Sequence, residues 1–287
     1  MIVPRTNASV AGRDAVEMRF RSERSFAVED TVRTSNKLTF VTTSWDDGDC
    51  TDLKLAELLR SKGIPGTFYV PIKYRERPLS HPDLRSLASE GFEIGAHGWT
   101  HKFLWRLSLE EVNQEVRPCK QALEDILGRE VEMFCYPAGR YDANTIRALQ
   151  AAGYKGARTV RMLATRPTLN SFKMPTTLQA FPHGRFTYLK NIGRARSLES
   201  LRSCFVQMPR LGRWVELGKA LFDEVLKEGG VWHLYGHSWE IEKHGLWNEL
   251  RELLDYVCRR DAVRYVPNCG LLRPNQLDPS LVQCKHA

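Results

Sequence analysis

The residues of this sequence best suited to chemistry are two adjacent carboxylates and a pair of histidines further along the chain. Asp46 and Asp47 directly follow a run of β-branched and aromatic residues, and His97 and His101 are four residues apart. Neighbouring side chains on extended backbone point in different directions, so the two carboxylates can serve different tasks. The plainer interpretation of the aspartates is a polar turn that leads into a helix.

The spacing of the two histidines predicts a metal site. If the chain turns helically after His97, both imidazoles lie on one face and can bind the same cation. One of the two carboxylates would complete a two-His, one-Asp set with open positions, which suits a divalent metal that activates water. The other carboxylate would then accept a proton from that water. His237 can supply the proton that a departing amine needs, so the set favours hydrolysis.

Secondary structure must position these residues, and the sequence alternates between strand and helix patterns. Strands are predicted at 38–45, 66–71, 92–97, 131–136, 155–160, 174–181, 231–237 and 263–266, and helices at 51–62, 82–90, 108–128, 144–152, 214–227 and 246–260. This alternation predicts an α/β fold with a parallel sheet covered by helices. Seven or eight such units closing on themselves would make a (β/α) barrel. In barrels the chemistry lies at the C-terminal strand ends, where the candidate residues fall.

Composition sets the broader frame. The 287 residues are 42% hydrophobic, which is enough to bury a full core as one domain. No apolar run of about 18 residues is present, so no membrane span is expected. The N-terminus resembles no secretory signal and the seven cysteines form no C-x-x-C pair, which favours a cytoplasmic protein with reduced thiols.

The chain divides into three predicted regions. Residues 1–36 are expected to form a loosely ordered extension, 37–272 the catalytic barrel and 273–287 a tail. Within the barrel a basic insertion covers about 166–213, where Glu199 is the only acid near these cations: Arg185, Lys190, Arg194, Arg196, Arg202, Arg210 and Arg213. The insertion is interpreted either as a solvated surface or as a binding region for a phosphate-bearing, nucleotide- or lipid-linked sugar. It lacks the interleaved aromatics of a single-strand groove, so nucleic acid is not an expected partner.

Two motifs carry a family resemblance. Ser44-Trp-Asp-Asp-Gly48 resembles the T-F-D-D-G motif of the NodB-type polysaccharide deacetylases, and His97-Gly-Trp-Thr-His101 resembles their H-[ST]-x-x-H motif. The resemblance covers roughly residues 37–270. It implies a distorted (β/α) barrel that hydrolyses N-acetyl groups on amino sugars with one divalent metal. Zinc is the first expectation, and cobalt, nickel or iron are the alternatives.

The resemblance also implies roles for individual residues. By position, Asp46 would be the general base, while the metal ligands would be Asp47, His97 and His101. The segment 134–139 resembles the third motif of the family, in which the backbone near Ala138 would help to hold the oxyanion. Tyr136 and Arg140 are expected to contact substrate beside it. The strand 231–237 resembles the one that carries the L-x-H histidine, here His237 as the acid.

The sequence departs from the family pattern in its third and fourth motifs. Cys135 stands where the family often has an arginine that pairs with the base aspartate, and we expect Arg158 to replace it, with Arg140 as second choice. The fourth motif is not recognisable, which leaves Glu240 as the only suggested partner for the acid histidine.

Two further residues, in or just after the predicted strand 231–237, have alternative interpretations. His233 points to the same side of the strand as His237 and is the second-choice acid. Trp239 is expected either to form an apolar wall for the acetyl methyl group or to belong to the core.

Three functions follow from these patterns. The first is metal-dependent removal of an acyl group, most simply acetyl, from an amino sugar or oligosaccharide, in cell-surface polysaccharide or glycoconjugate biosynthesis. The second keeps the fold and metal but cleaves a formamide or cyclic amide. The third is an anionic-ligand-binding protein that uses the Arg-rich insertion.

Overall fold

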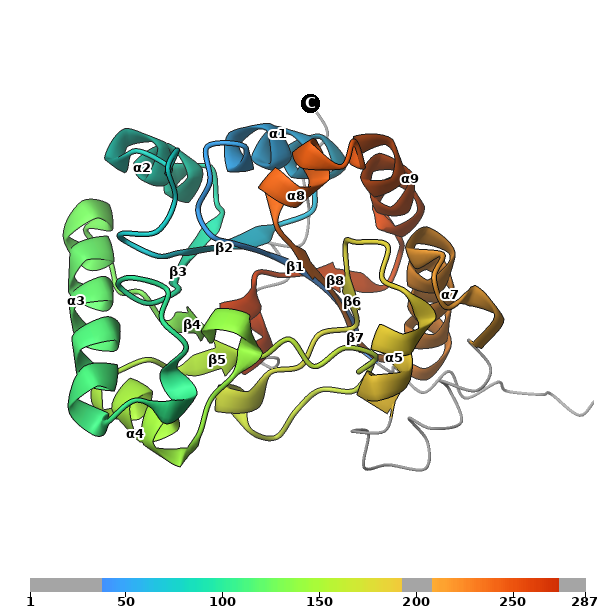
Figure 1. Ribbon diagram of the computed structural model, residues 1–287. Helices are drawn as coiled ribbons and strands as arrows, with labels where there is room; N and C mark the ends of the chain where they lie inside the picture. Colours follow the sequence, from blue (N-terminus) through green and yellow to red (C-terminus); the bar gives the residue numbers. More distant parts are fainter. Residues whose placement is uncertain (1–37, 193–207, 274–287) are drawn as a thin grey trace, which may run out of the picture. The chain divides into compact units, whose positions relative to one another are not determined.

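A sheet of eight parallel strands forms the centre of the protein, whose computed structural model describes residues 38–192 and 208–273 (Figure 1). The strands are β1 (Thr39–Asp46), β2 (Gly66–Val70), β3 (Glu93–Ala96), β4 (Met133–Cys135), β5 (Gly156–Arg158), β6 (Leu178–Gln179), β7 (Gly230–Gly236) and β8 (Val263–Tyr265). Their order is β5-β4-β3-β2-β1-β7-β6, and β8 pairs with β1. All described residues belong to one compact unit that spans Asn36–Ala287.

The central strand β1 organises this sheet. All eight of its residues are buried, as expected for a parallel strand covered on both faces. Strand β7 runs beside it from Thr39 to Trp45, while β8 pairs with its first residues and β2 with its last. Because its neighbours hold it along its whole length, β1 fixes the position of the residues that follow it.

The sheet curls so that its two edges are joined by one segment, residues 174–180. At one end Met174 exchanges backbone hydrogen bonds with the β5 edge, through Ala157 (3.0 Å) and Thr159 (2.8 Å). At the other end Thr177 and Ala180 donate to β7, to carbonyls at 2.9 and 2.7 Å. The sheet is therefore a distorted half-barrel, which confirms the predicted fold class.

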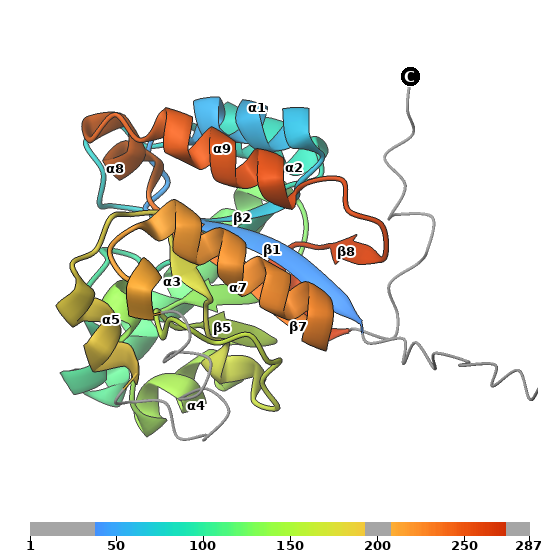
Figure 2. The same cartoon turned by 90° about the vertical axis from the view of Figure 1, so that its right-hand side faces the viewer.

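Helices cover the outside of the curled sheet (Figures 1 and 2). The α-helices are α1 (Asp52–Lys62), α2 (His81–Ser89), α3 (Leu109–Leu127), α4 (Ala143–Ala151), α5 (Arg185–Ile192), α7 (Trp214–Glu228), α8 (Ser238–Lys243) and α9 (Trp247–Val257). The 3₁₀ turns are η1 (Leu104–Arg106), η2 (Pro137–Gly139), η3 (Ser171–Lys173), η4 (Met208–Arg210) and η5 (Asn268–Leu272). Neighbours in the outer layer follow the order α4, α3, α2, α1, α9 and α7.

Local signals account for the helix ends that were predicted. Ser108 accepts a hydrogen bond from the backbone of Glu111, whose carboxylate accepts from the backbone of Ser108, so a capping box begins α3. Gly128 ends that helix at φ +66°. The predicted strand at 174–181 is wrong in length, because only Leu178–Gln179 is regular. Helices α5 and α8 were not predicted.

Parts of the predicted domain organisation lie outside the described residues. These are the extension 1–36, residues 193–207 of the basic insertion, and the tail beyond Arg273. Within the part of the chain that the structure describes, no helix combines the length and apolar character needed to cross a membrane.

Candidate active site

The predicted site residues meet at one end of the sheet, where the carboxyl ends of five strands come together. Their positions are Asp46 and Asp47 at the end of β1, His97 and His101 after β3, the 136–140 turn after β4, Arg158 at the end of β5, and His237 after β7. The chain leaves β1 through two left-handed residues, Asp47 at φ +83° and Gly48 at φ +61°. A short Asp side chain tolerates this region better than most. The turn separates the two carboxylates and directs them to different partners.

Asp47 and the two histidines form the first cluster. The Oδ1 atom of Asp47 lies 3.5 Å from Nε2 of His101 and 3.8 Å from Nε2 of His97. This oxygen is buried and has no hydrogen-bond partner among the described atoms. Leaving a buried carboxylate oxygen unpaired is costly, and a cation between the three atoms would remove that cost.

The environment of His97 prepares it as a ligand. Its Nδ1 lies 2.8 Å from the carbonyl oxygen of Cys135, so the ring proton belongs on Nδ1 and the Nε2 lone pair faces Asp47. Burial lowers the pKa of His97 and outweighs the nearby carboxylates, which keeps the ring neutral. These three side chains therefore fit a divalent metal, with two imidazoles and one carboxylate oxygen directed at one point.

The two histidines do not lie on a helix, which corrects the sequence-based explanation of their spacing. Gly98 at φ +87° and His101 at φ +60° make a loop, and this loop brings the two rings to 4.7 Å between centroids. The buried carboxylate of Glu115 on α3 holds the loop by accepting hydrogen bonds from the backbone N–H (2.7 Å) and the hydroxyl of Thr100. Glu115 was missed, although a charge on the apolar face of a predicted helix was a usable signal.

Asp46 forms the second cluster with Arg158. A guanidinium Nη2 of Arg158 donates to Oδ1 of Asp46, and the guanidinium lies between the rings of Tyr69 (5.3 Å) and Tyr235 (4.8 Å). Burial raises the pKa of Asp46, but the charge of Arg158, helped by nearby histidines, outweighs it and lowers the pKa to about 2. Asp46 is therefore ionised at any working pH. The Sγ of Cys135 lies 3.7 Å from its second oxygen, and Arg140, the second-choice partner, does not reach it.

His237 faces the same second oxygen of Asp46. Its Nε2 lies 4.0 Å from Oδ2 of Asp46, and its Nδ1 lies 2.6 Å from the carboxylate of Glu240 in the first turn of α8. Burial lowers the pKa of His237, but the hydrogen bond to Glu240 and the charges of Asp46 and Asp47 outweigh it and raise the pKa. The pKa of Glu240 is lowered by the same pair, against the effect of burial. The imidazole is thus oriented and kept close to its charged form.

His233, the second-choice acid, lies in the interior of the half-barrel. Its Nδ1 donates to the carbonyl of Pro175 (3.1 Å), and its Nε2 accepts from the hydroxyl of Ser44 (2.8 Å). Burial, and then the charge of Arg158, lower its pKa to about 3, so the ring is neutral.

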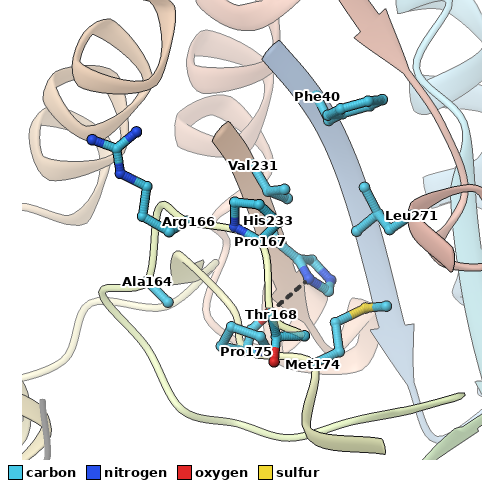
Figure 3. A pocket seen from close by; sticks show the side chains of 10 residues that line it. All are labelled: Phe40, Ala164, Arg166, Pro167, Thr168, Met174, Pro175, Val231, His233 and Leu271. Carbon is cyan, nitrogen blue, oxygen red and sulfur yellow. Dashed lines mark hydrogen bonds between the residues drawn. The ribbon is translucent and has the colours of Figure 1, made fainter. Parts of the chain in front are cut away.

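The ring of His233 also borders a narrow cavity of about 50 Å³ between the starts of β1 and β7, lined mainly by apolar side chains such as Phe40 (Figure 3). This cavity is at the opposite ends of the strands from the metal cluster.

Trp239 lies beside Asp47 and is only partly buried. Its Nε1 donates to Oδ2 of Asp47 at 2.9 Å, so the indole holds the carboxylate whose other oxygen faces the histidines. Arg75 stacks on the indole at 4.7 Å and donates twice to Asp49, at 2.9 and 3.1 Å. A chain of contacts thus links the loop after β2 to the candidate metal ligand. No local pattern predicts this contact, because Trp239 and Asp47 are far apart along the chain.

The residues of the turn after β4 differ in burial, so they cannot all contact a substrate. The ring of Tyr136 is buried and its hydroxyl donates to the carbonyl of Phe172 (2.9 Å), so its side chain belongs to the core. Ala138 is exposed and left-handed at φ +53°, a strained state for alanine that recurs at functional sites. Gly139 follows because any Cβ there would meet Val160 at 2.2 Å. Arg140 lies at the surface.

An exposed aromatic side chain that was not predicted also borders the metal cluster. Tyr74, in the loop after β2, stacks on the ring of His101 with centroids 4.1 Å apart and an angle of 17° between the rings. It is 47% exposed, and the guanidinium of Arg75 lies 6.0 Å from its ring centroid.

Comparisons with known proteins find similarity to polysaccharide deacetylases. The family model described as "Polysaccharide deacetylase" matches residues 33–157. Bacillus subtilis YxkH, provisionally described as a polysaccharide deacetylase, is 24% identical over 46% of this chain and 48% of its own length. Chitin deacetylase 1 of Cryptococcus neoformans is 34% identical over 38% of this chain and 23% of its own length. The chain thus spans half or less of these two relatives.

Two solved structures share the fold. A Mycobacterium smegmatis protein, provisionally described as a polysaccharide deacetylase, has a TM-score of 0.61 at 18% identity, covering 88% of this chain and 96% of its own. A Clostridium thermocellum family 4 acetyl xylan esterase in complex with a cobalt ion has a TM-score of 0.54 at 14% identity, covering 85% and 97%. At these identities the likeness concerns the fold alone.

Proposed function

Because the chain belongs to the polysaccharide deacetylase family, we propose that it is a metal-dependent hydrolase that removes acetyl groups from the amino sugars of a saccharide. One observation carries the proposal: the unpaired buried Oδ1 of Asp47 and the Nε2 atoms of two histidines converge beside an ionised Asp46. A hydrolase needs this combination of ligand set and separate base. We include in the proposal a role in building a cell-surface glycan.

In this proposal Asp47, His97 and His101 hold one divalent ion, with zinc as first choice and cobalt, nickel or iron as alternatives. The C. thermocellum relative was solved with cobalt. When bound, such an ion polarises an acyl oxygen and lowers the pKa of water towards about 7. Trp239 keeps Asp47 in place through its hydrogen bond, as an outer partner of a ligand commonly does.

Asp46 is the proposed base. Arg158 fixes one of its oxygens, so the other is left to accept a proton from the attacking water. The charge of Arg158 keeps the carboxylate ionised before the reaction, and the burial of the pair keeps competing protons away. The guanidinium of Arg158 thus pairs with the base aspartate, as the family's arginine does at the position that Cys135 occupies here.

His237 is the proposed acid. Its raised pKa favours the protonated ring, and its Nε2 faces the site while Nδ1 is held by Glu240. A protonated imidazole in this orientation can donate to the departing amine nitrogen. After that donation, the proton that Asp46 has accepted can pass to the neutral His237, whose Nε2 is 4.0 Å from Oδ2 of Asp46, which restores both groups.

The remaining groups would bind the substrate. The exposed turn at Ala138 borders the carboxyl end of β4, and its backbone is proposed to help hold the oxyanion. Tyr74 stacks on His101 and Trp239 donates to Asp47, so both rings lie beside the metal cluster, where they suit the apolar faces of a sugar and its acetyl methyl.

The test is acetate release by metal-reconstituted protein from N-acetylglucosamine oligomers, with O-acetylated xylan measured in parallel. We expect chelator-sensitive acetate release from the N-acetylated oligomers and none from the Asp46→Asn variant. Acetate from the O-acetylated polymer alone would make the protein an esterase. Metal binding without acetate release from either would contradict the proposed activity.

A further inference from the structure

The loops that surround the candidate site after β3, β4 and β5 carry positive charge and no carboxylate. Residues 97–107, 136–141 and 159–164 contain no Asp or Glu. They contain four exposed cations: Lys102, Arg106, Arg140 and Arg161. Some exposed cations elsewhere on the described surface are paired, as Arg60 is with Glu90 and Lys54 with Glu242.

These four cations make no ion pair with any carboxylate in residues 38–192 and 208–273. Two of them are instead held by an aromatic ring. The guanidinium of Arg106 lies 3.8 Å from the ring centroid of Trp105, and that of Arg140 lies 5.1 Å from the same centroid. We call this group the Arg106–Trp105–Arg140 stack.

The stack joins two loops that also carry site residues. Trp105 is in η1, four residues after His101, and that length of chain reaches at most about 14 Å. Arg140 ends the turn that begins at Cys135, whose carbonyl holds His97. The stack is therefore close enough in the chain to the metal cluster for a neighbouring sugar of a bound saccharide to reach it.

Stacking on an indole prepares a guanidinium for an anionic ligand. It fixes the plane of the cation and leaves its N–H donors directed outward, where they can meet two oxygens of a carboxylate, sulfate or phosphate. Two such cations with no counter-ion of their own repel each other, and an anion between them removes that repulsion. A neutral sugar chain has no group that does this.

We propose that the Arg106–Trp105–Arg140 stack is a subsite for an anionic group on a sugar that neighbours the N-acetylated residue. The inference rests on the proposed deacetylase function and adds a substrate class to it: an acidic saccharide that carries carboxylate, sulfate or phosphate. Another cation–aromatic pair is near the stack in the chain: Lys73, in the loop after β2, lies 5.1 Å from the ring centroid of Trp99, which is in the same loop as Trp105.

The test is calorimetric binding of tetrasaccharides of equal length to metal-loaded protein, in an Asp46→Asn background that blocks hydrolysis. The probes are neutral N-acetylglucosamine tetramer, the same tetramer bearing sulfate or phosphate, and a tetramer alternating N-acetylglucosamine with glucuronic acid. We expect at least one anionic probe to bind about tenfold more tightly than the neutral one at low salt. Comparison of the sulfated, phosphorylated and glucuronate-containing probes identifies which anion the stack prefers.

The matched variants decide whether the stack is responsible. Arg106→Gln with Arg140→Gln should abolish the preference, while Arg147→Gln, an exposed arginine on the following helix α4, should leave it unchanged. Equal affinity for all probes, or a preference that survives the double variant, would overturn the inference. Equally tight, stack-dependent binding of single-stranded DNA would overturn the saccharide assignment.

Failure of the inference and failure of the proposed function can be told apart. If the wild-type protein releases acetate from neutral oligomers while binding shows no anion preference, the function stands and the subsite is wrong. If the stack-dependent preference is found and no oligomer releases acetate, the subsite stands and the deacetylase proposal is wrong.

Discussion

Two histidines four residues apart, His233 on β7 and His237 directly after it, have surroundings of opposite character. His233 is in the interior, where a serine hydroxyl and a backbone carbonyl satisfy both ring nitrogens and its pKa is lowered to about 3. His237 is at the strand end, where Glu240 and Asp46 face it and its pKa is raised. The same residue type is thus neutral and fully hydrogen-bonded within the strand, and faces carboxylates directly after it.

The neighbours of each histidine explain the difference. The groups that hydrogen-bond to His233 are neutral. Asn268, whose Nδ2 lies 3.4 Å from Nε2 of His233, donates a hydrogen bond to Thr42 (2.8 Å) and accepts one from Tyr69 (2.8 Å). Around His237 the pKa values of Asp46 and Glu240 are lowered, and one oxygen of Asp47 has no partner among the described atoms. Unmatched buried charge is expensive to maintain, so its presence at the strand ends points to a ligand that the interior cluster does not need.

The largest expected effect is that of Asp46→Asn. The amide cannot accept the proton, so we expect turnover of acetylated substrate to fall by about 10³-fold. The amide oxygen can still accept from Arg158, so the metal content by elemental analysis should stay near the wild-type value. Turnover within a few-fold of the wild type would remove Asp46 from the role of base.

Replacing the two histidines separately tests the comparison itself. His237→Ala should lower turnover by about 10²-fold or more with little loss of stability. His233→Ala should lower the free energy of unfolding by about 2 kcal/mol, because Ser44 and the Pro175 carbonyl lose their partner, with a smaller effect on turnover. Denaturant midpoints and turnover measured on both proteins give the answer. Equal, small losses in both variants would contradict the assigned roles.

The pH dependences of the two histidines should have opposite signs. The unfolded chain binds a proton at His233 near pH 6.5, whereas the folded chain resists it down to about 3, so His233 makes stability fall as pH falls through this window. For His237 the raised pKa adds stability at low pH, and this is lost as pH rises through that pKa. In the His233→Gln variant, the denaturation midpoint should therefore fall less steeply than in the wild type as pH is lowered from about 6.5 to 5.

Turnover should follow His237, because the acid must be protonated. Activity is expected to decline as pH rises through its raised pKa, and Glu240→Gln should move that decline to lower pH by removing the carboxylate that supports the charge. A pH–rate profile of the metal-loaded enzyme tests this. An alkaline limb that stays in place in Glu240→Gln would show that another group titrates there.

A smaller effect is expected for Trp239→Phe. The phenyl ring keeps much of the contact with Arg75 but cannot donate to Asp47, so metal affinity should weaken by about tenfold. Metal competition with a chromophoric chelator measures it. Unchanged affinity would mean that the indole does not orient the ligand.

Patterns that are local in the chain could be predicted from it. The strands that end at Asp46 and Arg158 and the capping box of Ser108 depend on residues close together in sequence. Alternating strands and helices then placed the candidate residues at the same end of the sheet. The structure adds what depends on distant contacts, such as Trp239 on Asp47, 192 residues apart, and Glu115 holding the loop between the two histidines. The joining of the sheet edges by residues 174–180 belongs to the same class, because the backbone partners of this segment are on β5 and β7 and its own sequence does not identify them.

The most direct test of the central claim is the number of divalent ions bound per chain after reconstitution, measured by elemental analysis on the wild type and on Asp47→Asn, with Asp49→Asn as the matched control. Asp49 pairs with Arg75 and does not face the histidines. We predict about one ion per chain in the wild type and in the control, and a clear loss in Asp47→Asn. No metal in the wild type, or full occupancy in Asp47→Asn, would contradict a centre built from Asp47, His97 and His101.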